Sequence, residues 1–509
     1  MVFASLGIAL ATWLYGVRQP QSHDEFSYLL AADTYSRFRL TNPPHPHWEF
    51  FETFHVIHQP TYMSKYPPGQ GLVLALGIVT GGHPIVGVWL CSLIMVASIT
   101  WMLQACFSPR WALFGGLVAA SRFAMVGYWA QSYWGQTLAV VGGALLFGGL
   151  VRIVQSPSRR AAIIMAVGIS ALAVSRPYEG FVLCVVPAIV LVGLWCKSDR
   201  ERRRRLIAKV VIPASAVLVV WAGLFMWNNY RVTGQPLRLP YLVHTERYEA
   251  PPFFIFQRPQ SLQYSHKDLK AFWEGWALQK YSEQMTLSGY LGSKIAASGV
   301  TWYYILGPIL SIPVLFSLVS WRKWWAKVAF TGVALVSFAI LLVTWSLPHY
   351  ATPMVPLLVI LVVEGCRRLT ALTSRRSAVM GRWAPYLLLI LMMALTWLDG
   401  KRQGVLAEQT DFTRNRQIII DQLMSMPGRH VVLVRSGPRY NLHCDWVYNS
   451  ASIDEQKIIW ARDMGDSKNQ DLMAYFAGRQ FHVLDVNATR DLPALSEYLP
   501  KSAAPMRSE

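Results

Sequence analysis

Cysteine and charged residues are scarce in this sequence, and their scarcity excludes several classes of protein. Only six cysteines occur in 509 residues, and five of them lie in or beside apolar segments, which leaves Cys444 alone in the polar C-terminal region. A disulfide framework and a cysteine-type metal site are therefore excluded. Charged residues make up 15% of the chain and hydrophobic residues 53%, which is more apolar than a soluble enzyme should be. This composition indicates a polytopic α-helical membrane protein.

Acidic residues are also few, with 28 Asp and Glu against 47 Lys and Arg and a net charge of +19. The basic residues cluster in short loops between apolar segments, which is the pattern of cytoplasmic loops in membrane proteins. Basic patches interleaved with aromatic residues are missing, so we expect no nucleic-acid partner. The segment from Met1 to Val17 lacks a basic start and a small-residue cleavage site. We therefore interpret it as the first membrane span and not as a cleavable signal peptide.

Apolar runs of spanning length predict about eleven transmembrane helices. They cover residues 1–17, 85–107, 111–127, 135–154, 161–175, 179–196, 210–228, 298–319, 328–346, 351–366 and 383–398. The run 70–80 is too brief to cross easily, and counting it as a span would place the basic clusters around Arg152 and Arg202 on opposite sides. We interpret it as a juxtamembrane or re-entrant helix.

With that choice every basic cluster is cytoplasmic. The first outer loop (18–84), the second outer loop (229–297) and the region after Asp399 then share the outer side. We expect a multi-pass protein of the bacterial cytoplasmic (inner) membrane whose outer loops face the periplasm. The mixture of apolar, aromatic and Pro residues from Tyr230 to Phe256 can lie in the interface and contact a lipid chain, or it can simply pack over the helix ends.

The periodicity changes at Asp399, which divides the chain into a transmembrane domain (1–398) and a small C-terminal α/β domain outside the membrane (399–509). Helical spacing over 410–426 and 469–478 alternates with strand-like runs at 430–435, 457–462 and 481–486. No Gly-rich phosphate fingerprint follows these strands. We predict a flavodoxin-like or Rossmann-like accessory domain without a nucleotide site, serving recognition and not bond making.

The polar stretch that follows the first span holds the strongest candidates for chemistry. Asp24 and Glu25 are adjacent carboxylates, which repel each other unless one is protonated, paired or bound to a cation. Lys65 closes the stretch, and the two prolines at 67 and 68 stiffen the chain after it. This pattern suits a site that abstracts a proton and holds an anion. Two solvated acids and a snorkelling lysine are the alternative interpretation.

Further basic and aromatic residues fall near the same membrane surface. Arg176 lies in a turn so short that it must sit at that surface, where it is either an anion anchor or a local partner of Glu179. Arg122, near the outer end of its apolar segment, has the same two interpretations. His349 and Tyr350 stand at the head of another span and could reach the same vestibule, although a lone His is more often structural.

Histidines are dense in the first outer loop and raise the question of a metal ion. His55 and His58 are spaced i, i+3, so on a helix they could share a zinc ion. His-rich loops beside Pro are also frequent on polar surfaces. The sequence requires no cofactor and leaves a divalent metal open.

The motifs at these positions resemble those of the GT-C superfamily of polyprenyl-phosphate-sugar-dependent glycosyltransferases, in its aminoarabinose transferase and protein O-mannosyltransferase branch. The resemblance covers residues 1–370 and rests on three motifs, which are Asp24-Glu25-Phe26-Ser27-Tyr28, Lys65-Tyr66-Pro67-Pro68 and Ser175-Arg176-Pro177. The sequence departs from the family in the loop 131–136, which lacks the second acidic residue that some members have.

The resemblance implies transfer of a sugar from a polyprenyl-phosphate carrier to a lipid, glycan or protein acceptor on the outer face, with inversion of the anomeric centre. Asp24 would take the acceptor proton, and Glu25 would orient the acceptor or tune Asp24. Lys65 and Arg176, with Arg122 as a further candidate, would bind the donor phosphate. Tyr28, Tyr66 and Tyr241 would line the substrate vestibule together with the His349–Tyr350 pair.

Two other classes of protein share parts of this pattern. A lipid or solute transporter would also be polytopic and would also carry its basic residues in cytoplasmic loops. Transporters, however, usually show paired repeats and broken helices at the midplane of the membrane. A non-catalytic membrane scaffold or sensor would be supported only by the C-terminal α/β region. Convergence of Asp24, Lys65 and Arg176 at the outer face is the feature that would favour the transferase.

Overall fold

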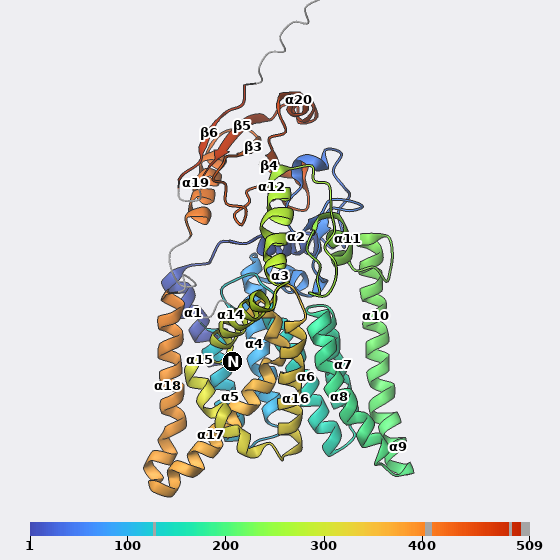
Figure 1. Cartoon of the computed structure of the whole chain (residues 1–509), viewed down its shortest axis with the longest axis vertical. Helices are drawn as coiled ribbons and strands as arrows, with labels where there is room; N and C mark the ends of the chain where they lie inside the picture. Colours follow the sequence, from blue (N-terminus) through green and yellow to red (C-terminus); the bar gives the residue numbers. More distant parts are fainter. Residues whose placement is uncertain (126–128, 403–409, 488–490, 500–509) are drawn as a thin grey trace, which may run out of the picture.

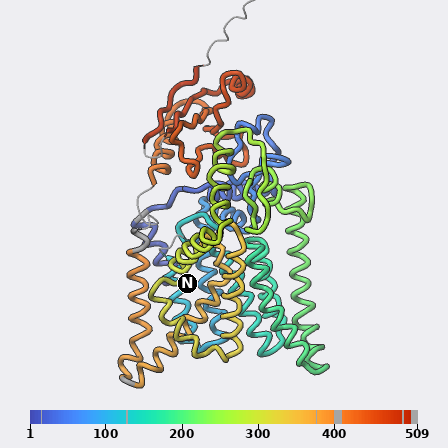
Figure 2. Tube along the Cα trace, viewed as in Figure 1, coloured from blue at the N-terminus to red at the C-terminus, as the bar shows by residue number. Residues whose placement is uncertain are grey.

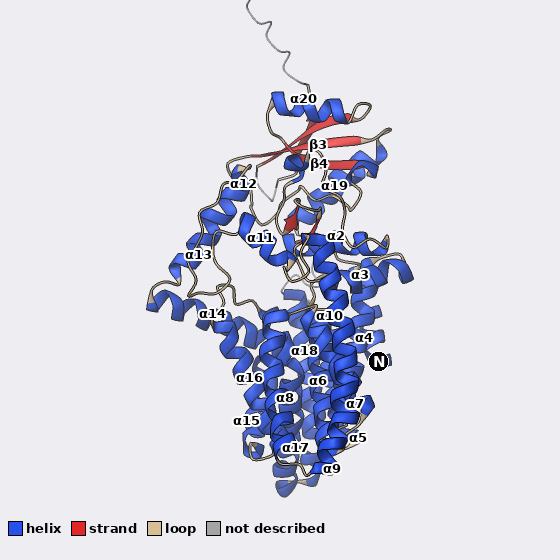
Figure 3. Cartoon of the chain, turned by 90° about the vertical axis from the view of Figure 1, so that its right-hand side faces the viewer, coloured by secondary structure: helices blue, strands red, loops and turns tan. Residues whose placement is uncertain are grey.

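Apolar helices form a bundle at one end of the molecule, and a four-stranded sheet lies at the other end (Figure 1). The computed structural model describes residues 1–125, 129–402, 410–487 and 491–499. The helices of the two outer loops lie between bundle and sheet, and the basic helix α9 (Arg200–Leu206) lies at the far end of the bundle in both views (Figures 1 and 3). The outer loops and the C-terminal region are therefore on one side and the Arg202 cluster on the other.

The bundle is built from helices of unequal length. They are α1 (Val2–Tyr15), α4 (Pro84–Leu103), α5 (Pro109–Ala119), α6 (Gln136–Gln155), α7 (Arg159–Ala173), α8 (Pro177–Cys196), α10 (Ile212–Thr233), α14 (Leu287–Ile305), α15 (Gly307–Ser317), α16 (Trp324–Leu341), α17 (Val355–Arg376) and α18 (Ala378–Arg402). The trace in Figure 2 shows α10 and α18 at opposite edges of this bundle. The end of the predicted span 111–127 lies outside the described residues.

In the described ranges, six helices are long and apolar enough to cross a membrane, and seven if α14 and α15 count as one bent span. The other predicted spans correspond to helices that are shorter or, like α17, carry more charge. The molecule has the helices of a multi-pass membrane protein, and the number eleven stays a prediction.

The predicted span 298–319 is not one straight helix. It breaks between α14 and α15, which meet at 90°. Gly307 takes a left-handed φ of 61° there, and Pro308 follows it without an N–H to continue the helical ladder. The uniform apolarity of the segment concealed this break.

Glycines allow the inner helices to approach closely. A Cβ atom on Gly142 of α6 would lie only 2.9 Å from the carbonyl oxygen of Gly168 in α7. Helix α6 is also the most enclosed of the six, with 78% of its apolar window buried. In a membrane, such backbone contact is a main source of helix association, so α6 and α7 form a closely packed pair within the bundle.

The first outer loop folds into two helices with a small hairpin between them. Its elements are α2 (His23–Ser36), the 3₁₀ helix η1 (Trp48–Phe51), β1 (Val56–Ile57), β2 (Met63–Ser64) and α3 (Pro68–Gly81). Helix α3 packs on α2, where a Cβ on Gly71 would lie 2.7 Å from the Cβ of Ala31. Its 14 residues are short for a membrane span.

The second outer loop is mostly helical and leads from α10 to α14. Its elements are α11 (Pro240–Tyr248), α12 (Lys267–Lys270), the π-helical η4 (Ala271–Ala277) and α13 (Leu278–Glu283). Between α11 and α12, residues 252–255 pair with the end of α16. Thr344 N donates to Phe253 O at 2.9 Å, and Ile255 N donates to Leu342 O at 2.9 Å.

The C-terminal region forms a sheet of order β4-β3-β5-β6, in which β6 alone is antiparallel. Its elements are α19 (Asp411–Ser425), β3 (His430–Ser436), β4 (Ile458–Arg462), α20 (Asp466–Tyr475), β5 (Gln480–Val486) and β6 (Ala494–Glu497). The three parallel strands are the apolar runs of the sequence, because both faces of such a sheet are covered.

This C-terminal unit shares its core with the first outer loop. Phe26 of α2 stacks on Tyr448 with ring centroids 4.3 Å apart, and the Arg416 guanidinium lies 4.9 Å from the Phe26 ring. Arg462 of β4 donates to the carbonyl oxygen of Glu52 at 2.6 Å. The unit is therefore packed against α2, the helix that carries Asp24 in its first turn, and against the rest of the first outer loop.

Candidate active site

Asp24 stands in the first turn of α2, and its side chain is 23% exposed. The Tyr66 hydroxyl donates a hydrogen bond to Asp24 Oδ1, and His55 Nε2 lies 3.9 Å from the same oxygen. Burial raises the pKa of the Asp24 carboxyl, while the Tyr66 hydrogen bond and the charges of Lys65 and Arg176 oppose that rise. A carboxylate with a raised pKa is a better proton acceptor than an ordinary surface aspartate.

Glu25 is fully enclosed and held by backbone donors. Its Oε2 accepts from Gln21 N at 2.8 Å and Ser22 N at 3.2 Å, and its Oε1 accepts from Tyr133 N at 3.1 Å. The carboxyl is 1% exposed. Its oxygens are thus used to cap α2 and to hold the loop before α6, and the expectation that Glu25 orients the acceptor or tunes Asp24 stays a prediction.

Lys65, directly after β2, is buried in an ion pair with a residue that the sequence did not single out. Its Nζ lies 2.8 Å from Oε1 of Glu249, and both side chains are 4% exposed. His244 Nδ1 lies 2.8 Å from the same oxygen. Burial would raise the pKa of Glu249, but Lys65 and His244 outweigh it and lower that pKa to about 2.

Aromatic rings surround the Lys65 ammonium. The ring centroids of Tyr241, Tyr66 and Trp273 lie 4.8, 5.3 and 5.7 Å from Nζ. Tyr28 stacks on Tyr66 at 4.5 Å. The three tyrosines predicted to line the vestibule therefore meet around Lys65 and Asp24.

Arg176 caps the N-terminus of α8 and is brought to the site by backbone contact. Gly69 N, just after the Pro67–Pro68 pair, donates to Val174 O at 2.9 Å, which joins the end of the Lys65 motif to the turn that carries Arg176. The Arg176 guanidinium lies 4.9 Å from the centre of the Tyr350 ring. In the described part of the chain, no carboxylate lies within 4.0 Å of this guanidinium, so Glu179 does not hold it in a direct ion pair.

His349 lies next to this arrangement in the 3₁₀ helix η6 (Pro348–Met354). It is 8% exposed, and its ring lies 4.4 Å from that of Trp134 and 4.8 Å from that of Tyr350. Tyr350 therefore contacts the Arg176 guanidinium, and His349 packs against the Tyr350 ring.

Arg122 is not part of this cluster. It lies in the π-helical η2 (Ala120–Ala124), and its guanidinium donates to the carbonyl oxygens of Tyr303 at 2.5 Å and Tyr304 at 3.0 Å. These carbonyls belong to the last turn of α14, just before the break at Gly307. This side chain therefore contacts the end of the broken helix, and binding of the donor phosphate by Arg122 stays a prediction.

The proposed histidine pair is not on a helix either. His55 precedes β1 and has a φ of 62°, and His58 follows β1. The rings of His23 and His244 lie 5.7 and 5.9 Å from that of His55. Over the described residues, no three His, Cys, Asp or Glu side chains are grouped so that they could hold a metal ion. The i, i+3 argument for zinc at His55 and His58 is therefore wrong.

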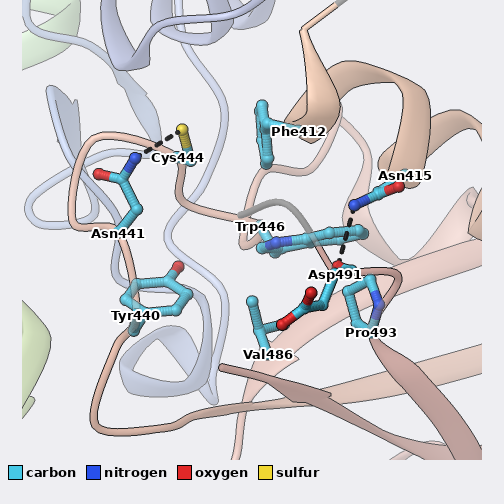
Figure 4. A pocket seen from close by; sticks show the side chains of 9 residues that line it. All are labelled: Phe412, Asn415, Tyr440, Asn441, Cys444, Trp446, Val486, Asp491 and Pro493. Carbon is cyan, nitrogen blue, oxygen red and sulfur yellow. Dashed lines mark hydrogen bonds between the residues drawn. The ribbon is translucent and has the colours of Figure 1, made fainter. Parts of the chain in front are cut away.

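Two other hollows occur on the molecule. One lies in the C-terminal unit and has a cavity volume of about 10 Å³, which is far below the roughly 300 to 1,000 Å³ typical of small-molecule sites. Figure 4 shows its lining of Phe412, Asn415, Tyr440, Asn441, Cys444, Trp446, Val486, Asp491 and Pro493. The other is an open groove near the end of α15, lined by Leu318, Trp321, Lys327, Phe330, Thr331 and Ala334. Neither joins an acid to two cations, as the outer-loop cluster does.

Comparison with known proteins bears on this arrangement. No protein-family profile matches the sequence, and no curated protein matches it. Among solved structures, ArnT from Cupriavidus metallidurans in the apo state is 12% identical with a TM-score of 0.53, covering 95% of this chain and 92% of that one.

Two further structures show the same likeness. The same ArnT bound to undecaprenyl phosphate is 13% identical with a TM-score of 0.52, again over 95% and 92% of the two chains. The oligosaccharyltransferase of Archaeoglobus fulgidus in complex with Zn and sulfate is 11% identical with a TM-score of 0.51, over 95% of this chain and 67% of that one. Both proteins are GT-C glycosyltransferases. The chain has the GT-C fold, and the resemblance to that superfamily is confirmed at the level of fold.

Proposed function

We propose that this protein is an inverting membrane glycosyltransferase that moves a sugar from a polyprenyl-phosphate carrier to an acceptor hydroxyl on the outer face of the membrane. The observation that carries the proposal is the meeting of one acid with a raised pKa, Asp24, and two cations, Lys65 and Arg176, both close enough to lower that pKa. All three lie where the outer loops cover the bundle. The ArnT structure bound to undecaprenyl phosphate supports a polyprenyl-phosphate donor.

The chemistry follows from the roles that these groups can play. The acceptor hydroxyl attacks the anomeric carbon, and Asp24 takes its proton as the new C–O bond forms. The bond between the anomeric carbon and the phosphate oxygen breaks, and the electron pair leaves with the lipid phosphate. Lys65 and Arg176 stabilise the charge that grows on that phosphate.

The surrounding residues have supporting roles in this proposal. Glu25 fixes the start of α2 and so the direction of Asp24. Tyr66 holds one carboxylate oxygen, which leaves the other for the acceptor. Tyr28, Tyr241 and Tyr350 form the aromatic wall of the vestibule. No nucleotide takes part, because the donor phosphate stays on its lipid.

The active-site acid is tested by a matched pair of substitutions on α2. Asp24→Asn keeps size and polarity but removes the proton acceptor, so turnover of a polyprenyl-phosphate-linked sugar should collapse while donor affinity changes little. Asp33→Asn is the control, because Asp33 lies on the same helix with a similar exposure of 27%. If purified Asp24→Asn protein in nanodiscs transfers sugar at the wild-type rate, the proposed role of Asp24 is wrong.

The sugar and the acceptor are identified in the cell. Mass spectrometry of lipid-linked sugars and envelope glycans should show one polyprenyl-phosphate sugar accumulating and one glycan modification missing in a deletion strain. Loss of a transporter would instead change the side of the membrane on which the lipid-linked sugar accumulates.

A further inference from the structure

The ammonium of Lys65 is already paired with an anion of the protein itself. We propose that Glu249 occupies the position of the donor phosphate on Lys65, and that the strap formed by residues 240–255 moves away when the lipid phosphate enters. This inference rests on the proposed function, because it concerns how the donor reaches its cation. It assigns to Glu249 the role of an internal competitor that sets donor affinity.

The enclosure of the pair is the first support. Nζ of Lys65 and Oε1 of Glu249 are 2.8 Å apart, with 4% of each side chain exposed. The rings of Tyr241, Tyr66 and Trp273 surround the ammonium within 6 Å. A phosphate oxygen can contact Nζ only after the carboxylate or these rings have moved.

The chemistry of Glu249 is the second support. With its pKa lowered to about 2, the group is an anion at every physiological pH. It presents to Lys65 the same kind of oxygen that a phosphate would present. Exchange of one anion for the other therefore keeps the buried ammonium neutralised throughout, which avoids the cost of leaving it unpaired.

The position of the strap is the third support. Tyr241, on the strap, covers Lys65 and also contacts Phe253 with ring centroids 6.0 Å apart. Phe253 in turn lies 5.7 Å from Tyr178, near the start of the span α8. These rings form an apolar wall between the bundle and Lys65, which is the side from which a membrane-bound lipid arrives.

Helix α11 supplies a matched control for the test. Glu246 is on the same strap, three residues from Glu249, but its side chain is 57% exposed and pairs with Arg238. Glu246→Gln therefore changes the charge of the strap equally without touching Lys65. Any effect of net charge alone appears in both variants.

The experiment measures binding of undecaprenyl phosphate to the full-length protein in nanodiscs by native mass spectrometry. Glu249→Gln removes the competing charge, so its affinity should exceed that of wild type about tenfold or more, the size of a charge-assisted contact. Glu246→Gln should bind as wild type does. Glu249→Asp, which keeps the charge but retracts it by one methylene, should also bind more tightly and serves if the Gln variant does not fold.

The sign of the change decides between competing roles. If Glu249 instead holds Lys65 in position for the phosphate, both Glu249 variants bind more weakly than wild type, and the inference is overturned. Unchanged affinity overturns it as well and leaves the proposed function standing. If wild type and all variants fail to bind any polyprenyl phosphate, the proposed function falls, and this inference falls with it.

Discussion

Asp445 of the C-terminal unit anchors the first outer loop through a buried pair, and replacing it tests whether the two parts fold as one. Asp445 Oδ2 lies 2.6 Å from Nη2 of Arg462 and accepts from Thr53 Oγ1 at 2.9 Å. The two charged side chains are 0% and 5% exposed. Burial would raise the pKa of Asp445, but Arg462 and the neighbouring donors lower it, so the group is an anion.

Asp445→Asn leaves Arg462 buried without its main counter-charge. Removing one partner of a buried ion pair costs about 3–5 kcal/mol. The neighbouring His23 stacks on Phe54 with ring centroids 4.2 Å apart and directly precedes Asp24. Loosening this contact should therefore also lower the transfer rate.

A second ion pair between the same two parts provides the control. Arg37 of α2 and Glu455 lie 3.2 Å apart, but Glu455 is 71% exposed. Exposed pairs contribute less than about 1 kcal/mol. Glu455→Gln should therefore leave both stability and transfer nearly unchanged.

Hydrogen exchange is the suitable assay, because unfolding of a large membrane protein is not two-state. Local opening of residues 50–57 should become about two to four orders of magnitude more frequent in Asp445→Asn, which is the population change equivalent to about 3–5 kcal/mol. The double variant Asp445→Leu/Arg462→Met removes both charges and should recover part of the protection. If Asp445→Asn exchanges no faster than Glu455→Gln, the C-terminal unit does not hold the loop.

Three further outcomes are expected. The pKa of Asp24 is raised and the base must be deprotonated, so the transfer rate measured across a pH series should fall on acidification with a midpoint above the usual value of about 4. Tyr66→Phe removes a hydrogen bond that lowers this pKa and should move the midpoint to higher pH. A midpoint at or below about 4 would contradict this. Arg176→Ala should weaken undecaprenyl phosphate binding by about ten- to a hundredfold in the same nanodisc measurement, and equal affinity would remove Arg176 from the phosphate site. Reporter fusions after Arg205 and after Ser425 should report the cytoplasm and the outer side respectively, and the same side for both would refute the topology.

The sequence contained enough information to locate the groups that meet at the site. Asp24, Lys65 and Arg176 were found because ionisable residues beside apolar spans are costly and so indicate function. Two helices and three strands of the C-terminal unit followed from its switch between helical and strand-like periodicity, whereas β6 was not predicted. These signals are local, and each is complete within a few residues.

What could not be predicted depends on contacts between distant segments. Glu249 is 184 residues from Lys65, and its sequence surroundings differ little from those of the exposed Glu246. Arg122 contacts carbonyl oxygens at the end of α14, beside a helix break at Gly307 that apolar periodicity does not reveal. The apolar side chain of Phe26 reads as part of an ordinary helix face, and only the fold shows that it packs on Tyr448 of the C-terminal unit.

Water is the competitor that this arrangement has to exclude, because its hydroxyl can attack the anomeric carbon as an acceptor does. In the proposed mechanism, the burial that raises the pKa of Asp24 also limits the contact of water with the carboxylate, and removal of water would strengthen the attraction between the cations and the leaving phosphate. Three separate parts of the chain supply the enclosure: the C-terminal unit behind α2, the strap with Glu249 over Lys65, and the α8 turn with Arg176. A donor that displaces Glu249 then opens the site only as far as its own phosphate fills it. In the proposed mechanism the phosphate replaces the Glu249 carboxylate on Lys65, so the site stays filled by an anion and an activated sugar is protected from hydrolysis until an acceptor arrives.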